Sequence, residues 1–167
     1  TQEHGVKPEV FLLDLPRAAR MHSLRGDPTL NLRGGLWHPD GMRILLSDSK
    51  GLQNRYVDAM TGKEMSSLPC RGTPIAFSAD GKRLLWIRDD KTSLFICDAV
   101  TGVTQVEIRG HEGFVGGAEF SPDSRFLVFT DNALLASPVT TALEFNFATN
   151  LYAFDVVSGT QNLLTMN

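Results

Sequence analysis

The chain has 167 residues, of which 42% are hydrophobic and 21% are charged, and its formal net charge at pH 7 is −3. These proportions are ordinary for a globular protein and exclude a disordered or collagen-like chain. A net negative charge provides no general field for binding nucleic acid, and no apolar run approaches the roughly 18 residues of a membrane-spanning helix. We therefore expect a folded chain with a sizeable core, no nucleic-acid partner and no membrane span.

The N-terminal region predicts two strands. After a polar lead-in at residues 1–8, residues 9–15 (EVFLLDL) form an apolar run of strand length, and residues 18–24 predict the next strand. Residues 25–34 are polar and contain Gly, Asp and Pro, which indicates a connection.

A complete structural unit follows in the middle of the chain, at residues 77–108. A short apolar run turns at Asp80-Gly81 into a strand at residues 83–88, and further strands at residues 93–98 and 103–108 are separated by turn residues. Asp-Gly and Thr-Gly mark turns because glycine adopts positive φ without steric penalty. The unit predicts a four-stranded antiparallel meander.

Both turn motifs of this unit recur along the chain. The first is carried by Asp40, Asp80 and Asp123, and the second by Asp58-Ala-Met-Thr-Gly62, Asp98-Ala-Val-Thr-Gly102 and Asp155-Val-Val-Ser-Gly159. Both repeat at intervals of about 40 residues, and four strands in that period are the signature of a propeller blade. The last interval of the second motif is longer, which places an insertion at residues 130–149.

Three segments at the first turn resemble the strand pair that opens a blade in WD40-type and TolB-like (PD40) propellers. They are WHPDGMRILLSD, FSADGKRLLWIRDD and FSPDSRFLVFTD, and Gly110-His111 is similar to the Gly-His of a WD40 repeat. The Trp-Asp that ends the third strand of a WD40 repeat is replaced by Val57-Asp58, Cys97-Asp98 and Phe154-Asp155. Both subfamilies stay open.

The resemblance implies an all-β fold made of β-propeller blades. We expect the last two strands of a preceding blade within residues 1–31, blades at residues 32–70, 71–110 and 111–167, and thus about three and a half blades. Propellers close with 4–8 blades. The chain is therefore expected to be part of a larger propeller, completed by further blades of a longer chain or by a second copy.

The predicted function is a non-catalytic scaffold that binds a protein or peptide partner through its blade-to-blade and strand 2–3 loops. The sequence contains no Gly-x-Ser-x-Gly, His-Glu-x-x-His, phosphate-binding Gly loop or EF-hand pattern, and its four histidines lack metal-ligand spacing. No catalytic residue, metal or cofactor is predicted. The alternative is the propeller portion of an enzyme, either the regulatory domain of a prolyl-oligopeptidase-like hydrolase or a propeller enzyme with a channel-mouth site.

Two sets of residues are candidates for partner binding. An Arg precedes Gly in three blade-to-blade connections, at Arg25, Arg71 and Arg109. We expect these side chains near one end of the central channel of the propeller, where guanidinium groups can bind carboxylate or phosphate. The alternative is that each Arg pairs with a neighbouring Asp or is solvated. The insertion is mostly apolar and includes Leu134, Leu135 and Phe145, which suggests a contact surface. Its alternative is an extended strand pair or a flap over its own blade.

Some residues are expected to be structural. The turn aspartates are predicted to hold their turns, and Trp37, Phe77 and Phe120, which share one repeat position, are predicted to be core between blades, as is Trp86.

Cys70 and Cys97 are predicted to be free thiols. We expect them at opposite faces of the ring, separated by a strand length of about 17–20 Å, whereas a disulfide needs Cα atoms within about 7 Å. Free thiols favour a reducing compartment such as the cytoplasm. A periplasmic or secreted location stays open because TolB-like relatives are periplasmic.

Overall fold

The computed structural model describes residues 10–14, 19–24, 32–48, 53–88, 93–109, 114–134 and 147–165, and all regular structure in them is β-strand. The strands are β1 (Val10–Asp14), β2 (Ala19–Leu24), β3 (Leu32–Trp37), β4 (Arg43–Asp48), β5 (Asn54–Asp58), β6 (Glu64–Leu68), β7 (Thr73–Phe77), β8 (Arg83–Ile87), β9 (Leu94–Asp98), β10 (Thr104–Ile108), β11 (Phe114–Phe120), β12 (Phe126–Leu134), β13 (Phe147–Asp155) and β14 (Thr160–Leu163). None of these described segments forms a helix long and apolar enough to cross a membrane.

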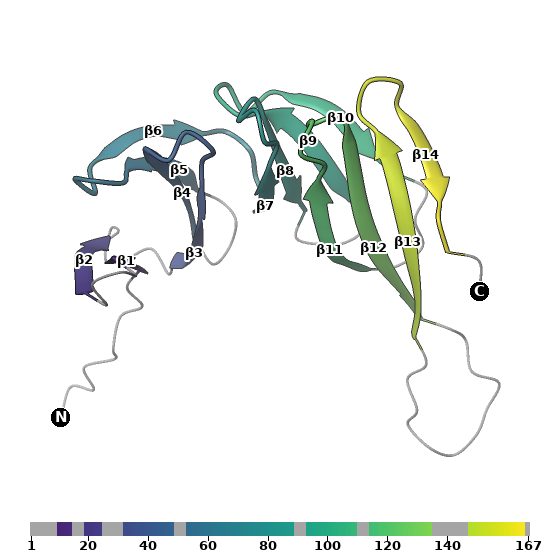
Figure 1. The fold of residues 1–167 in the computed structure, drawn as a ribbon, viewed down its shortest axis with the longest axis horizontal. Coiled ribbons are helices and arrows are strands. Elements are labelled where there is room, and N and C mark those ends of the chain that lie inside the picture. Colours follow the sequence, from purple (N-terminus) through teal and green to yellow (C-terminus); the bar gives the residue numbers. More distant parts are fainter. Residues whose placement is uncertain are drawn as a thin grey trace, which may run out of the picture.

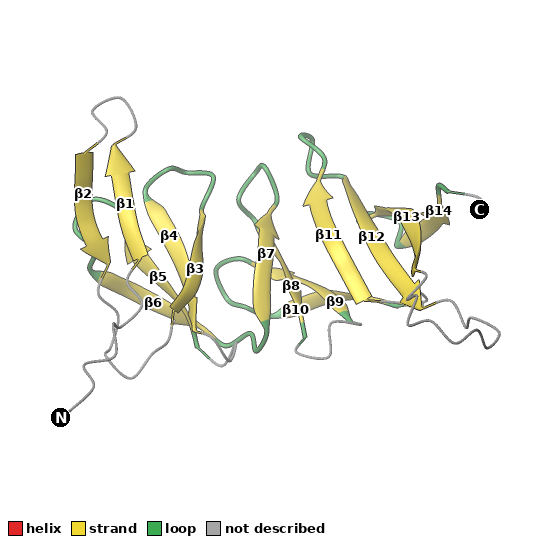
Figure 2. Ribbon diagram, turned by 90° about the horizontal axis from the view of Figure 1, so that it is seen from below, coloured by secondary structure: helices red, strands yellow, loops and turns green. Residues whose placement is uncertain are grey.

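The strands form one hairpin and three four-stranded sheets. β1 pairs with β2, and the first (β3–β6), second (β7–β10) and third (β11–β14) sheets each pair consecutive strands antiparallel. The sheets stand side by side in chain order, with β3, β7 and β11 as neighbouring edge strands (Figures 1 and 2). The predicted all-β architecture of four-stranded meanders is confirmed, and β8, β9 and β10 begin and end within one residue of their predicted ranges.

The core lies between the sheets because the second strand of each sheet is apolar on both faces. In β8, Leu84 and Trp86 pack in a cluster with the first sheet, whereas Leu85 and Ile87 pack with the third. Side chains alternate between the two faces of a strand, so one short apolar strand contributes to two inter-sheet cores. Burying each large apolar side chain stabilises the fold by about 1.5–3 kcal/mol before entropy costs are counted.

The shared repeat position is only partly core. Phe120 is 7% exposed and packs against the second sheet, and Phe77 is half-buried against the first. The prediction is wrong for Trp37, which is 53% exposed. Each buried member packs against the preceding sheet, and within the described residues only the β1–β2 hairpin precedes the first sheet. Trp86 is core as predicted and stacks on Phe95, with the ring centroids 4.4 Å apart.

Both cysteines are free, as predicted, but their expected separation is wrong. The Sγ atoms of Cys70 and Cys97 lie 3.6 Å apart. Neighbouring strands rotate by roughly 20–25°, so the rotation accumulates across a sheet, and β6 lies almost across the direction of β3 (Figure 2). The end of β6 therefore points at the second sheet, so a strand length does not separate Cys70 from Cys97.

Part of the predicted insertion is an extended strand pair. β12 and β13 continue into it, with Asn132 opposite Thr149 and Leu134 opposite Phe147. This supports the extended-pair alternative for the two ends of the insertion. Leu135 and Phe145 lie outside the described residues.

Candidate functional site

The turn aspartates hold their turns. Asp98 Oδ1 accepts hydrogen bonds from Val100 N, Thr101 N and Thr101 Oγ1 at 2.8–3.0 Å, and Asp58 makes the same three contacts in the first sheet. The hydrogen bonds from Thr101 lower the pKa of Asp98. A carboxylate stabilised in its charged form by its own turn is a structural group, not a proton donor.

The first turns of neighbouring sheets also contact one another. His38 Nε2 lies 3.1 Å from Gly81 O, and Asp80 N donates to Ser124 Oγ at 3.1 Å. A side chain at Gly81 would begin 2.7 Å from His38 Cε1, so the histidine fills the space that the missing side chain leaves. These contacts fix the relative positions of the strand 1–2 turns along the row of sheets.

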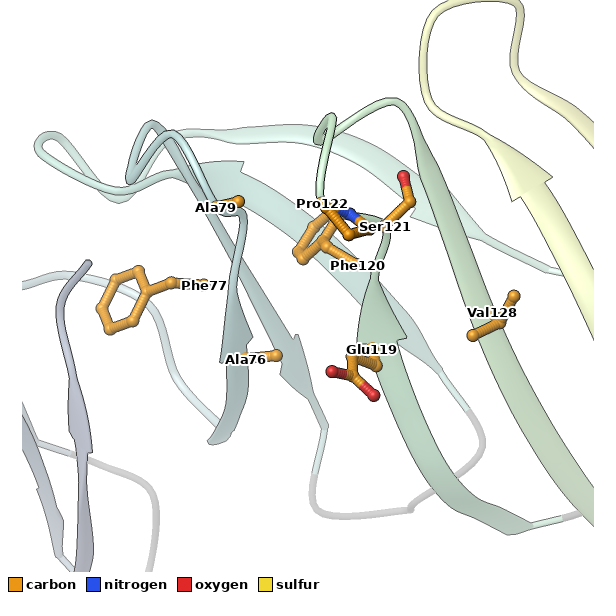
Figure 3. A pocket seen from close by; sticks show the side chains of 8 residues that line it. All are labelled: Ala76, Phe77, Ala79, Glu119, Phe120, Ser121, Pro122 and Val128. Atoms are coloured by element: carbon orange, nitrogen blue, oxygen red, sulfur yellow. The ribbon is translucent and has the colours of Figure 1, made fainter.

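A cavity of about 680 Å³ opens between the edge strands β7 and β11 (Figure 3). Its walls come from both strands, from the turns that follow them and from β12. The lining residues are Ala76, Phe77, Ala79, Glu119, Phe120, Ser121, Pro122 and Val128. Glu119 is the one charged residue among them, and its carboxylate lies between β11 and the side of β7 that bears Ala76 (Figure 3). The pocket combines apolar walls with one negative charge.

The hydroxyl in this pocket is engaged in its own turn. Ser121 Oγ donates to Asp123 Oδ1 at 2.5 Å and accepts from Phe126 N at 2.8 Å. No His or Lys lines the pocket to act as a base for it. The arrangement suits noncovalent binding of apolar groups and of a cation.

The predicted arginine and insertion residues are not part of this pocket. Arg71 is exposed. Arg109 is exposed and donates to Glu107 Oε2 at 2.6 Å, so it pairs with a neighbouring Glu rather than with the Asp of the alternative. Arg25 lies outside the described residues, and Leu134 ends β12. Within the described ranges, no group of three or more His, Cys, Asp or Glu side chains is placed to hold a metal ion.

The pocket was missed by sequence reasoning because its walls come from two different repeats. Ala76 and Glu119 belong to no motif, and only the packing of β7 beside β11 brings them together. The one available signal was the repeat itself, which predicts that first strands of successive blades are neighbours.

Solved structures with the same architecture identify the fold. The chain aligns with hydrazine synthase from Kuenenia stuttgartiensis with a TM-score of 0.70 and 19% identity, over 93% of this chain and 47% of that one. It aligns with the β-propeller domain of Cps50 (Swd1) from Myceliophteria thermophila with a TM-score of 0.57 and 16% identity, over 92% of this chain and 65% of that one. The chain has a β-propeller fold. The three sheets correspond to blades of larger propellers, so the chain spans part of such a ring.

Sequence comparison adds one distant relative. No family model matches the propeller sequence. It is 31% identical over 97 residues to the uncharacterized peptidase YuxL of Bacillus subtilis (strain 168). The aligned part is 58% of this chain and 14% of YuxL, so this propeller chain spans a small part of that relative.

Proposed function

We propose that the chain is a non-catalytic part of a β-propeller that binds a protein or peptide partner, and that the pocket between β7 and β11 is a docking site for it. The observation that carries the proposal is the lining of the pocket, which is apolar with a single carboxylate, and whose one hydroxyl is engaged in its turn. The sequence predicted a partner site in the blade-to-blade and strand 2–3 loops. This pocket lies instead beside the strand 1–2 turns.

The chemistry of the pocket favours an apolar segment that carries a positive charge. Its volume falls within the range of about 300–1,000 Å³ that is typical of ligand sites. Ala76 and Val128 offer contact area to apolar side chains, and Glu119 accepts hydrogen bonds from a lysine, an arginine or an amino terminus. An acidic segment is disfavoured by the same carboxylate.

Fluorescence anisotropy with labelled peptides tests this site. An apolar heptapeptide with a central lysine should bind residues 1–167 more tightly than its counterpart with a central glutamate. Glu119→Gln should weaken the lysine peptide about two- to fivefold, the expected loss of one exposed ion pair. Glu64→Gln removes the same charge from β6 and serves as the control. Equal binding of both peptides, or equal effects of both variants, would contradict the proposal.

The loop residues are proposed as a second part of the partner surface. Guanidinium groups for binding carboxylate or phosphate are supplied by Arg25, Arg71 and Arg109. An apolar contact surface is supplied by the insertion residues Leu134, Leu135 and Phe145. Deleting residues 134–144 separates the two interpretations of the insertion. A folded variant that no longer binds its partner supports a contact role, whereas undiminished binding with reduced stability indicates a structural one.

A second candidate function is the propeller portion of a peptidase. The sequence match to YuxL favours it. The engagement of Ser121 Oγ in its own turn, with no His or Lys in the pocket lining, agrees with a hydrolytic centre outside residues 1–167. In that case a fluorophosphonate probe applied to the native protein should label a serine outside these residues. Labelling of Ser121, or labelling of the isolated chain, would contradict this assignment.

A further inference from the structure

Cys70 and Cys97 form a pair of buried thiols between the first and second sheets. Their sulfur atoms are in contact at 3.6 Å, and the residues are 5% and 0% exposed. Cys70 lies in the connection from β6 to β7, and Cys97 lies in β9. They belong to one apolar cluster that also contains Tyr56 and Trp86.

The segment that carries Cys70 is held against the second sheet by packing and by hydrogen bonds. Asn54 Nδ2 donates to Cys70 O at 2.8 Å. A Cβ atom at Gly102 would lie 2.6 Å from Pro69 Cδ and 3.3 Å from Cys70 Sγ, so the segment rests directly on the β9–β10 turn. Both sulfurs are therefore fixed by the contact between the sheets.

The two thiols have different tendencies to ionise. The hydrogen bond with the Cys97 thiol lowers the pKa of Cys70. The same hydrogen bond, together with burial, raises the pKa of Cys97. In the packed pair the hydrogen bond therefore favours the thiolate of Cys70 over that of Cys97, and the thiolate is the nucleophilic form.

We propose that Cys70 and Cys97 are an oxidation site that closes to a disulfide joining the first and second sheets. A disulfide bond is about 2.05 Å long, so the sulfurs need to approach by about 1.5 Å. The packing of the two sheets already brings the sulfurs this close to bonding distance.

The reaction is an exchange with a low-molecular-weight disulfide such as oxidised glutathione. The thiolate of one cysteine attacks one glutathione sulfur, the glutathione S–S bond breaks, and one glutathione thiolate leaves. The thiolate of the other cysteine then attacks the cysteine sulfur of the mixed disulfide and displaces the second glutathione thiolate. The two protons lost by the cysteines are taken up by the leaving thiolates. The cysteine pair is oxidised by two electrons, and glutathione disulfide is reduced by two.

Burial determines when this exchange happens. Glutathione needs access to one of the two sulfurs, and the packed sheets exclude it from both. Oxidation therefore proceeds while the contact between the first and second sheets is open, during folding or in a locally opened state. Once the sheets pack, the bond is shielded from reductants.

To test this, residues 1–167 are incubated with oxidised glutathione in urea just below the unfolding midpoint. The reaction is then stopped with acid, and the unreduced protein is analysed by peptide mass spectrometry. We expect an intrachain Cys70–Cys97 link and a Tm raised by roughly 5–10 °C, since the bond closes a loop of sequence separation 27. Added reductant after unfolding should remove the increase. Cys97→Ala and Cys70→Ala should stop at a mixed disulfide, with no gain in Tm. The proposal is overturned if both thiols of the wild-type chain stay open to alkylation, if they link only between chains, or if the bond leaves the Tm unchanged or lower.

Discussion

The backbone of Ser124 has a φ of 60°, a value that non-glycine residues adopt only with strain. Glycine stands at the same repeat position in the other two sheets, at Gly41 and Gly81. Ser124 is buried, and its hydroxyl accepts the hydrogen bond from Asp80 N of the neighbouring sheet. The contact between turns offsets the strain of the serine backbone.

Two substitutions at Ser124 separate these effects. Ser124→Ala keeps the strained φ and removes the acceptor for Asp80 N, so we expect a loss of about 1–2 kcal/mol in the free energy of unfolding. Ser124→Gly also removes the acceptor but relieves the strain, so its loss should be about 1 kcal/mol smaller. Urea unfolding monitored by tryptophan fluorescence measures both. Equal losses would mean that the backbone strain has no energetic consequence.

The lowered pKa of Asp40 predicts that the free energy of unfolding falls in acid. Burial alone would raise its pKa, but hydrogen bonds from Met42 N and Arg43, with His38 nearby, lower the pKa from its ordinary value of 3.8 to about 2. A lowered folded-state pKa contributes stability that is present above about pH 4 and is lost as the pH falls toward 2. We expect the free energy of unfolding to decline between these values, and Asp40→Asn to decline less steeply. Parallel pH profiles of the two proteins would contradict this.

At the scale of the elements, the connection from β6 to β7 depends on Gly72. Its φ is 148°, and a Cβ atom there would collide with Ile87 O and lie 2.5 Å from Trp86 Cε3. The backbone therefore passes directly over the Trp86 ring. The same segment bears Cys70 and is bound by Asn54 Nδ2 through Gly72 O at 3.3 Å.

Gly72→Ala should destabilise the chain by about 3 kcal/mol or more because both the backbone and the Trp86 ring must shift. Gly41→Ala is the matched control. Gly41 has a φ of 70°, and a Cβ atom there meets nothing within 4 Å, so only backbone strain of about 1 kcal/mol is expected. Urea midpoints compare the two variants. A loss at Gly72 no larger than that at Gly41 would show that the connection relaxes without cost.

The elements were predictable where a motif specifies a turn. Asp98 and Gly102 identify both the place and the type of the β9–β10 turn, and the apolar runs beside them give the strands. The approach of Cys70 to Cys97 was not predictable from strand lengths, because it depends on the twist that accumulates across each sheet. The pocket at Glu119 was not predictable from any local pattern, because its two walls become neighbours only when β7 and β11 pack. Trp37 was misjudged because burial at that position depends on the preceding sheet.

At the scale of the whole molecule, the outer face of the third sheet lacks a covering sheet among the described residues. Leu45 in β4, Leu85 in β8 and Val128 in β12 share one repeat position. The first two are covered by the next sheet and are 0% exposed, whereas Val128 is 41% exposed and neighbouring Phe126 is 37% exposed. We propose that a further blade, from a longer chain or from a second copy, covers this face.

Residues 1–167 alone should then associate through this face, since exposed apolar surface and unpaired strand edges favour contact between copies. Val128→Lys should weaken association at least about tenfold, because burying an unpaired charge costs more than 1–2 kcal/mol. Val157→Lys introduces the same charge at a 77% exposed valine of the β13–β14 turn and should leave association unchanged. Sedimentation velocity over micromolar concentrations measures all three proteins. Val128 also lines the pocket, so peptide binding is measured separately from self-association. A compact wild-type monomer throughout this range would contradict the inference that the face requires a further blade. The protein would then tolerate the exposed Val128 face without burying it against a second sheet.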